Sequence, residues 1–150
     1  MIRTALLTLA LAPALAVAQG AAPAKPAAPP PQPVIYFRSP ANNAVVGTTF
    51  PVLFGLKNYG VAPAGVNVAR TGHFHILINS EAGAPGTVTP ADSLHRHYGG
   101  GQIETELTLA PGTYTLRLVL ADFEHKVIGP ELVSSPIKVT VKASGGGRKK

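Results

Sequence analysis

The fold is decided by residues 109–120, which read Leu-Ala-Pro-Gly-Thr-Tyr-Thr-Leu-Arg-Leu-Val-Leu. Tyr114, Leu116, Leu118 and Leu120 alternate with mostly polar residues in this stretch. An alternation with a period of two is typical of a strand that has one buried face. The sequence therefore predicts a strand over 113–121 whose apolar face must be covered by a second layer.

The Pro111-Gly112 pair in front of this strand is open to two interpretations. Pro suits the second position of a type II turn and Gly the third, as in a plain hairpin. A tyrosine directly after such a turn, here Tyr114, is also typical of the tyrosine corner of immunoglobulin-like sandwiches, where the chain crosses from one sheet to the other. We favour the corner, because the other apolar segments of the chain also suit short strands in two sheets.

Further strands are expected wherever apolar residues alternate between Pro- and Gly-containing intervals. They cover 34–38, 48–57, 72–79, 102–109 and 135–142, with a further candidate at 87–95. In 102–109 the alternation predicts a shared buried face for Ile103, Leu107 and Leu109. No window shows a capped pattern of helical period, so little helix is expected. The predicted fold is an all-β, immunoglobulin-like antiparallel β-sandwich of about seven strands.

The two ends of the chain differ from the segment between them. Residues 1–18 have a basic start, a largely apolar stretch of 13 residues from Ala5 to Val17 and a small-x-small ending, which is typical of a cleaved secretory signal. The alternative, a membrane anchor, needs a longer apolar span. Residues 19–33 resemble a Pro- and Ala-rich linker, and 143–150 a flexible basic tail. The predicted domain is 34–142, in a periplasmic or secreted protein with no membrane span.

Composition excludes several classes of protein. The 150 residues include no Cys, which rules out disulfide scaffolds, thiolate metal sites and thiol nucleophiles. The formal net charge is +6, from 13 basic and 7 acidic residues, but eight basic and all seven acidic residues lie within 34–142, which leaves that segment at +1. Because phosphate recognition needs a concentrated basic face, we expect no nucleic-acid partner.

Histidines carry the candidate chemistry. The two residues His73 and His75 share a face of the expected strand, with Cα atoms roughly 6.6 Å apart, and are close enough to chelate one ion. The connections before 72–79, before 102–109 and after 113–121 should meet at one end of such a sandwich. We therefore expect all the histidines of the chain at the same rim: His73, His75, His95, His97 and His125.

Nitrogen donors in this number favour copper(II) or zinc. Met1 is the only Met, so a mature chain without it has no soft sulfur donor for copper(I). Near His125, Asp122 and Glu124 are candidates to complete the ligand set, and Asp122 in particular to orient an imidazole through its second nitrogen. The alternative is that the histidines are unrelated surface residues.

Catalytic patterns are weak in this sequence. Ser80, Ser93, Ser134 and Ser135 lie in no nucleophile-elbow sequence. The Glu104 and Glu106 pair is better explained as the solvent face of a strand than as an acid and base. We therefore expect no enzymatic activity.

The histidine motifs resemble a family of bacterial secreted proteins, the domain of unknown function 4399. The resemblance rests on Gly-His-Phe-His-Ile-Leu-Ile-Asn at 72–79, on Leu-His-Arg-His-Tyr-Gly-Gly-Gly-Gln-Ile-Glu at 94–104 and on the segment from Leu109 to His125. It departs from the family pattern at Asn79, Ile103 and Tyr114, where an acid, Thr and often His are found. The resemblance implies export to the cell envelope and supplies no activity.

Two functions are consistent with these observations. The first is an exported protein that binds copper(II) or zinc through the histidine rim, for metal buffering, delivery or structural support. The second is a metal-free adhesion or envelope protein-interaction module that uses the same rim, with Tyr98 and Phe123 as contacts.

Overall fold

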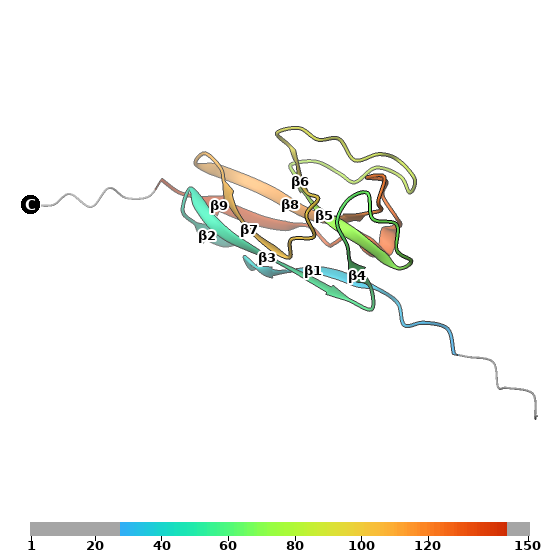
Figure 1. Cartoon of the computed structure of the whole chain (residues 1–150). Helices are drawn as coiled ribbons and strands as arrows, with labels where there is room; N and C mark the ends of the chain where they lie inside the picture. The colour runs from blue at the N-terminus through green and yellow to red at the C-terminus, as the bar shows by residue number, and fades with distance from the viewer. Residues whose placement is uncertain (1–27, 144–150) are drawn as a thin grey trace, which may run out of the picture.

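The computed structural model describes residues 28–143 and shows two β-sheets stacked face to face (Figure 1). The predicted signal, most of the linker and nearly all of the tail lie outside these residues. The first sheet has the order β1-β3-β7 and consists of β1 (Val34–Ser39), β3 (Thr49–Lys57) and β7 (Glu104–Thr108). All its neighbours are antiparallel.

The second sheet has six strands in the order β2-β9-β8-β5-β4, with β6 also paired to β5. Its strands are β2 (Ala44–Val46), β4 (Gly60–Val61), β5 (Thr71–Ile78), β6 (His95–Tyr98), β8 (Gly112–Ala121) and β9 (Ile137–Val141). The pairs β5-β8, β8-β9 and β5-β6 are antiparallel, whereas β2-β9 and β4-β5 are parallel.

This division of strands is that of an immunoglobulin-like sandwich, in which the first, second and fifth main strands oppose the third, sixth and seventh. Here β1, β3 and β7 oppose β5, β8 and β9, which confirms the predicted fold class. The described residues contain nine strands: six of the expected ones and the short β2, β4 and β6. Little helix is present, as expected: the described part has a single 3-10 turn, η1 (Pro130–Leu132).

The predicted strand at 87–95 does not form. Within that range Val88 makes only an isolated bridge to Lys126, and a regular strand, β6, begins at His95. The prolines and glycines of 83–90 suit a loop, and this loop pairs with another loop, a tertiary contact that local alternation does not reveal.

Tyr114 forms the predicted corner. Its hydroxyl donates a hydrogen bond to the carbonyl oxygen of Ala110 at 3.0 Å, four residues upstream across the Pro-Gly turn. The strand before the turn, β7, belongs to one sheet and the strand after it, β8, to the other. The turn is therefore a crossing between sheets and not a hairpin.

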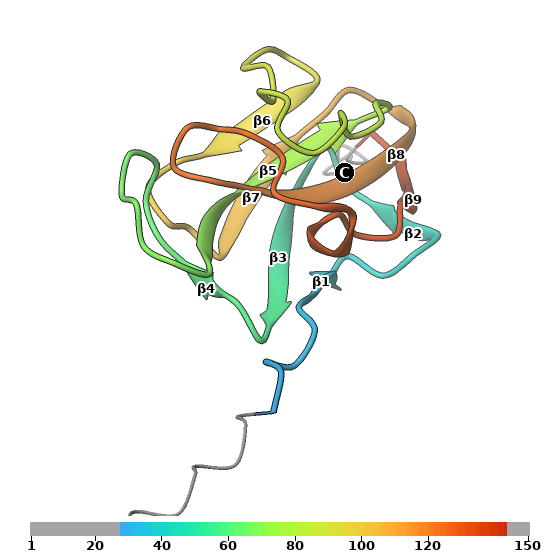
Figure 2. The same ribbon diagram turned by 90° about the vertical axis from the view of Figure 1, so that its right-hand side faces the viewer.

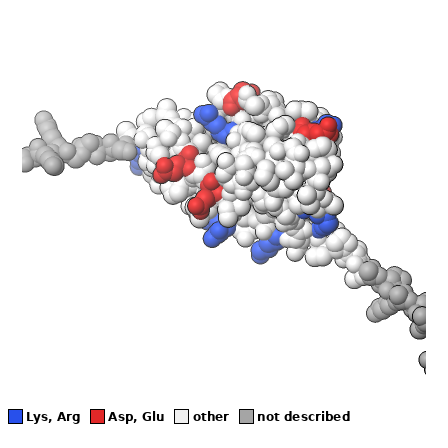
Figure 3. Space-filling model, in the orientation of Figure 1, with Lys and Arg blue, Asp and Glu red and all other residues white. Residues whose placement is uncertain are grey.

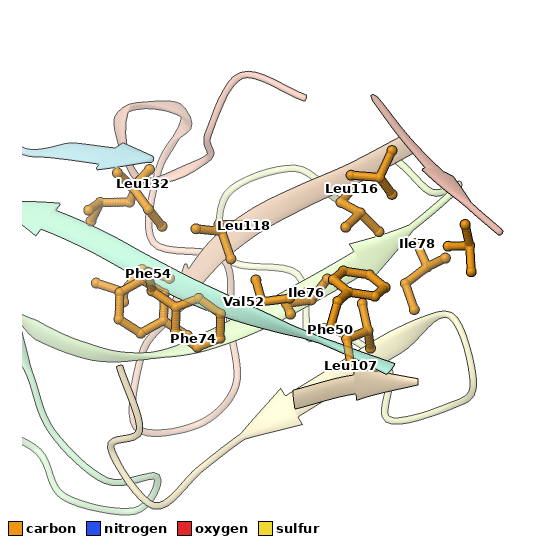
Figure 4. Close-up of a cluster of buried hydrophobic side chains, with 14 residues drawn as sticks. Phe50, Val52, Phe54, Phe74, Ile76, Ile78, Leu107, Leu116, Leu118 and Leu132 are labelled. Carbon is orange, nitrogen blue, oxygen red and sulfur yellow. The ribbon is translucent and has the colours of Figure 1, made fainter. Parts of the chain in front are cut away.

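The core lies between the two sheets and is built by alternating residues of β3, β5 and β8 (Figure 4). It includes Phe50, Val52, Phe54, Phe74, Ile76, Ile78, Leu116, Leu118 and Leu120, all nearly inaccessible to solvent. This confirms the predicted inward face of β8. Ile103 is an exception: it is 53 % exposed, because it lies in the bend before β7 begins and not in the strand itself.

The outer face of the larger sheet is also covered, which the sequence did not predict. Leu77 of β5 and Val119 of β8 pack with Val127 in a second, smaller cluster. The covering segments are the loop 80–94 and the segment 122–136, which follow β5 and β8. As a result β5 is buried on both faces, and side chains on its outer face are removed from water.

Charges are sparse on the surface. On the face shown in Figure 3, blue and red atoms are scattered over a mostly white surface and do not form a continuous basic area. Within residues 28–143 no helix is long and apolar enough to cross a bilayer.

Candidate metal centre

His73 and His75 occupy the outer face of β5 because Phe74, Ile76 and Ile78 alternate with them and face the core. The two histidines are 0 % and 1 % exposed. We expected this pair at one rim of the sandwich. The structure instead places it beneath the covering loops, and it is among the largest fully buried side chains of the protein.

Two further imidazoles reach the same place from other segments. His97 of β6 is paired with His75 across the antiparallel ladder, so both side chains leave the same face of the sheet. His125 comes from the loop after β8, which runs over β5 toward β6 in Figure 2. His97 is exposed and His125 is half-buried.

The ring nitrogens of these four histidines converge. Nε2 of His75 lies 3.1 Å from Nε2 of His73, which in turn lies 3.1 Å from Nδ1 of His125. The His97 ring centroid is 4.8 to 5.0 Å from the other three. One nitrogen from each of the four residues lies within 4.8 Å of all the others.

The turn that carries His125 is organised by Asp122. One carboxylate oxygen of Asp122 accepts hydrogen bonds from the backbone N–H groups of Glu124 and Lys126, both at 2.9 Å, and its carbonyl accepts one from the N–H of His125 at 3.0 Å. His125 itself has a positive φ of 66°, a conformation that is costly for a residue with a Cβ unless the surroundings impose it.

The roles predicted for the two acids therefore need correction. Asp122 bonds backbone N–H groups in place of an imidazole nitrogen, so it positions His125 through the turn. The carboxylate of Glu124 pairs with the ammonium group of Lys126 at 2.9 Å and does not join the cluster. The sequence correctly predicted that both acids lie near His125. It did not reveal that both carboxylates are engaged by other groups of the same turn.

His95 is the predicted ligand that the structure separates from the others. It lies on the same face as His97 but opposite Leu77, two pairs further along the ladder. Its Nδ1 contacts Asp92 Oδ1 at 2.8 Å and its Nε2 contacts Ser80 Oγ at 3.0 Å. Two positions along a strand displace a side chain by roughly 6.6 Å, and this takes His95 out of reach of the shared point.

Ser80, His95 and Asp92 together form a contact that sequence reasoning missed. Their order of bonding is that of a hydrolase triad, but the hollow beside His95 is lined by Asp92 and His95 and not by Ser80. The three residues join the beginning and the end of the loop 80–94. We therefore interpret the contact as a tie that holds this covering loop against the sheet.

Backbone hydrogen bonds fix the histidine-bearing segments on both sides. The carbonyl of His125 accepts a bond from the N–H of Thr89 at 2.8 Å, which joins the two covering loops. On the other side, the N–H groups of Ala64 and Gly65 donate to the carbonyls of Gly99 and Phe123 at 2.8 and 2.9 Å. The segment around residue 64 thus links the end of β6 to the His125 turn.

Gly99 makes room for the His97 ring. A Cβ placed on Gly99 would lie 2.3 Å from Cε1 and 2.5 Å from Nε2 of His97, and 3.3 Å from the Cβ of Ala64. Any side chain at this position would force the imidazole to move. The first glycine of the run 99–101 is therefore a steric requirement of the site.

The cluster favours neutral imidazoles. Burial, followed by the neighbouring His125 and His97, lowers the pKa of His73 to about 4. Burial and the neighbouring histidines, His73 first, lower the pKa of His75 to about 3. Burial and His125 also lower the pKa of His97. At neutral pH these three rings keep their lone pairs free, the state that a metal requires.

The donor set suits a transition metal. A metal to nitrogen distance of about 2.0–2.1 Å places two nitrogens of a tetrahedral site about 3.3 Å apart, close to the 3.1 Å contacts seen here. The Nδ1 atoms of His73 and His75 are buried without a hydrogen-bond partner in the described part of the chain. Packing, in place of the more common carboxylate, therefore orients these two rings toward the shared point.

The two aromatic residues considered as partner contacts have different surroundings. Tyr98 is half-buried and packs against Phe54 of the core, with ring centroids 5.3 Å apart. Phe123 is half-buried in the His125 turn and lines a hollow with Tyr59 and Val68.

Comparison with known proteins adds the family. The profile of the family described as Domain of unknown function (DUF4399) matches residues 52–142. The chain belongs to the DUF4399 family. The match includes all four converging histidines of this DUF4399 domain, together with His95, and it confirms the resemblance noted in the sequence.

No curated protein matches this DUF4399 chain. Among solved structures it is similar to one described as "Structures of Clostridium thermocellum CbhA fibronectin(III)-like modules". The two are 12% identical, with a TM-score of 0.41 over 79% of this chain. The alignment spans about half of the other chain, 51%.

Proposed function

We propose that this DUF4399 protein binds one divalent transition metal ion, copper(II) or zinc, through His73, His75, His97 and His125. The observation that carries the proposal is the convergence of four imidazole nitrogens within 4.8 Å of one another. Surface histidines that share no ligand have no reason to gather in this way, and two of these are almost fully buried.

The choice of metal follows from the donors. All four candidate ligands are imidazoles, without thiolate, thioether or carboxylate. Neutral imidazole is a ligand for zinc, copper and nickel, whereas Mg²⁺ and Ca²⁺ prefer oxygen. Because the chain has no Cys, no thiolate of the protein competes with these imidazoles as a zinc ligand.

The proposed place of action is the cell envelope or the exterior. Support comes from the signal-like residues 1–18 and the Pro- and Ala-rich linker 19–33. At that place its role would be to buffer the ion, to deliver it or to use it as structural support.

Equilibrium dialysis tests the proposal. The protein, purified without an affinity tag, is dialysed at pH 7 against zinc or copper(II), next to the His75→Ala and His95→Ala variants. We expect one ion per chain for the wild type and for His95→Ala, and none for His75→Ala. Equal uptake by all three proteins, or none by the wild type, would reject the site.

A further inference from the structure

The four candidate ligands differ sharply in their access to solvent. His73 and His75 are at most 1 % exposed, and His125 is held in a turn bonded to segments on either side. His97 is the exposed member. Its strand, β6, has four residues and pairs only with β5 among the described strands.

A hollow lies directly beside His97. It has a volume of about 590 Å³ and separates β6 from β7, with Ala91, His97, Tyr98 and Thr105 among its lining residues. The run Gly99–Gly101 follows β6 immediately, and Gly101 has a positive φ of 79°. The hollow provides space for an external molecule to approach the outer side of the cluster.

We propose that the bound ion is exchanged through His97, which acts as the releasable ligand, while His73, His75 and His125 retain the ion. This inference rests on the proposed function. A ligand carrying nitrogen or oxygen donors would enter the hollow and replace His97 first, so that the ion is never without ligands. The ion is then a cargo that passes to an acceptor, and not a permanent structural part.

Exchange is assigned to His97 because an incoming ligand reaches the ion at the buried positions only at a higher free-energy cost. To reach the ion from the side of His73 or His75, an incoming ligand must displace the covering loops and expose the Leu77, Val119 and Val127 cluster to water. Replacing His97 needs only a side-chain rotation at the edge of the sheet. The route of lower cost therefore runs through the hollow.

The first test compares a variant that lacks the exposed candidate ligand with one that lacks a buried candidate ligand. Zinc-loaded wild type, His97→Ala and His75→Ala are mixed with EDTA, and the rate of zinc transfer is followed. Lys138→Ala, exposed on β9 and outside this hollow, is the matched control. We expect His97→Ala to keep one ion per chain but to release it about tenfold faster or more, with Lys138→Ala unchanged and His75→Ala unable to bind.

If His97→Ala loses zinc as completely as His75→Ala, or releases it at the wild-type rate, the exchange route is wrong while the metal site stands. If the wild type holds no zinc or copper(II) at all, the proposed function itself fails. The two failures are therefore distinguishable.

The second test blocks the hollow. Because the chain has no Cys, Ala91→Cys creates a unique thiol on its lining, which is labelled with a bulky maleimide. Ser135→Cys, exposed and outside this hollow, carries the same label as control. We expect the label at 91 to slow EDTA-driven release at least threefold with unchanged zinc stoichiometry, and equal rates for the two labelled proteins would overturn the proposed route.

Discussion

Nε2 of His73 lies 3.1 Å from Nε2 of His75, on two side chains that are almost completely buried on the outer face of β5. At this distance one neutral ring can donate its Nε2–H to the other, and a metal ion can take the place of that hydrogen between the two nitrogens. Burial lowers the pKa of both rings and so keeps them neutral, which is the form that binds a metal ion. The pair is therefore suited to receive a metal ion.

The stability of the metal-free protein should decrease as the pH is lowered. In an unfolded chain these imidazoles take up protons below about pH 6.5, whereas the folded chain holds the pKa values of His73 and His75 at about 4 and about 3. The folded state therefore binds fewer protons in this window, and its unfolding free energy rises with pH. The free energy of unfolding is therefore highest above about pH 6.5 and decreases as the pH falls toward 3.

Thermal unfolding of the metal-free protein from pH 7 to pH 4 measures this effect. The melting temperature should fall on acidification, and fall less in His75→Gln, which lacks one of the two titrating rings. The same slope in both proteins would show that carboxylates elsewhere cause the change.

Gly99→Ala should weaken the metal site without unfolding the protein. The added Cβ would overlap the His97 ring and displace it, so we expect an affinity loss of about tenfold, comparable to the loss of an orienting contact. Gly100→Ala is the matched control, since a Cβ there meets only the Gln102 side chain at 3.1 Å. Competition with a chromogenic chelator measures both variants, and equal affinities would contradict the assigned role of Gly99.

Asp122 should act on metal affinity through the turn. Asp122→Ala removes the acceptor of two backbone N–H groups and frees His125, and we expect binding to weaken about tenfold. Asp122→Asn keeps an oxygen in place and should retain most of the affinity. Should both variants bind as weakly as each other, the negative charge and not the turn would be the cause.

Tyr114 should contribute to stability alone. Tyr114→Phe removes the hydroxyl that bonds Ala110, and the loss of one such bond costs about 1 kcal/mol. Urea unfolding monitored by circular dichroism gives the free energy, and metal affinity should be unchanged because the corner lies at the other end of β8 from His125. A variant as stable as the wild type would show that the bond does not support the crossing between sheets.

The sequence predicted what alternation and turn chemistry control. The period of two correctly placed Phe74, Ile76 and Ile78 in the core and His73 and His75 together on the opposite face. The Pro111-Gly112 turn with Tyr114 correctly predicted the crossing between sheets. These features depend on residues close in the chain.

The rest depends on contacts between distant loops. His95 was grouped with His97 because both belong to one motif, but its two ring nitrogens are engaged by Ser80 and Asp92, residues of a loop whose path no local pattern reveals. The burial of His73 and His75 likewise comes from loops that pair through Thr89 and His125. The prediction of a strand at 87–95 was wrong for the same reason.

X-ray absorption at the zinc or copper edge of the loaded wild-type protein identifies the atoms that coordinate the bound ion. We expect one ion coordinated by four imidazole nitrogens at about 2.0–2.1 Å, with three in His97→Ala and four in His95→Ala. A wild-type spectrum dominated by solvent oxygen, or one in which His95→Ala loses an imidazole and His97→Ala does not, would contradict it.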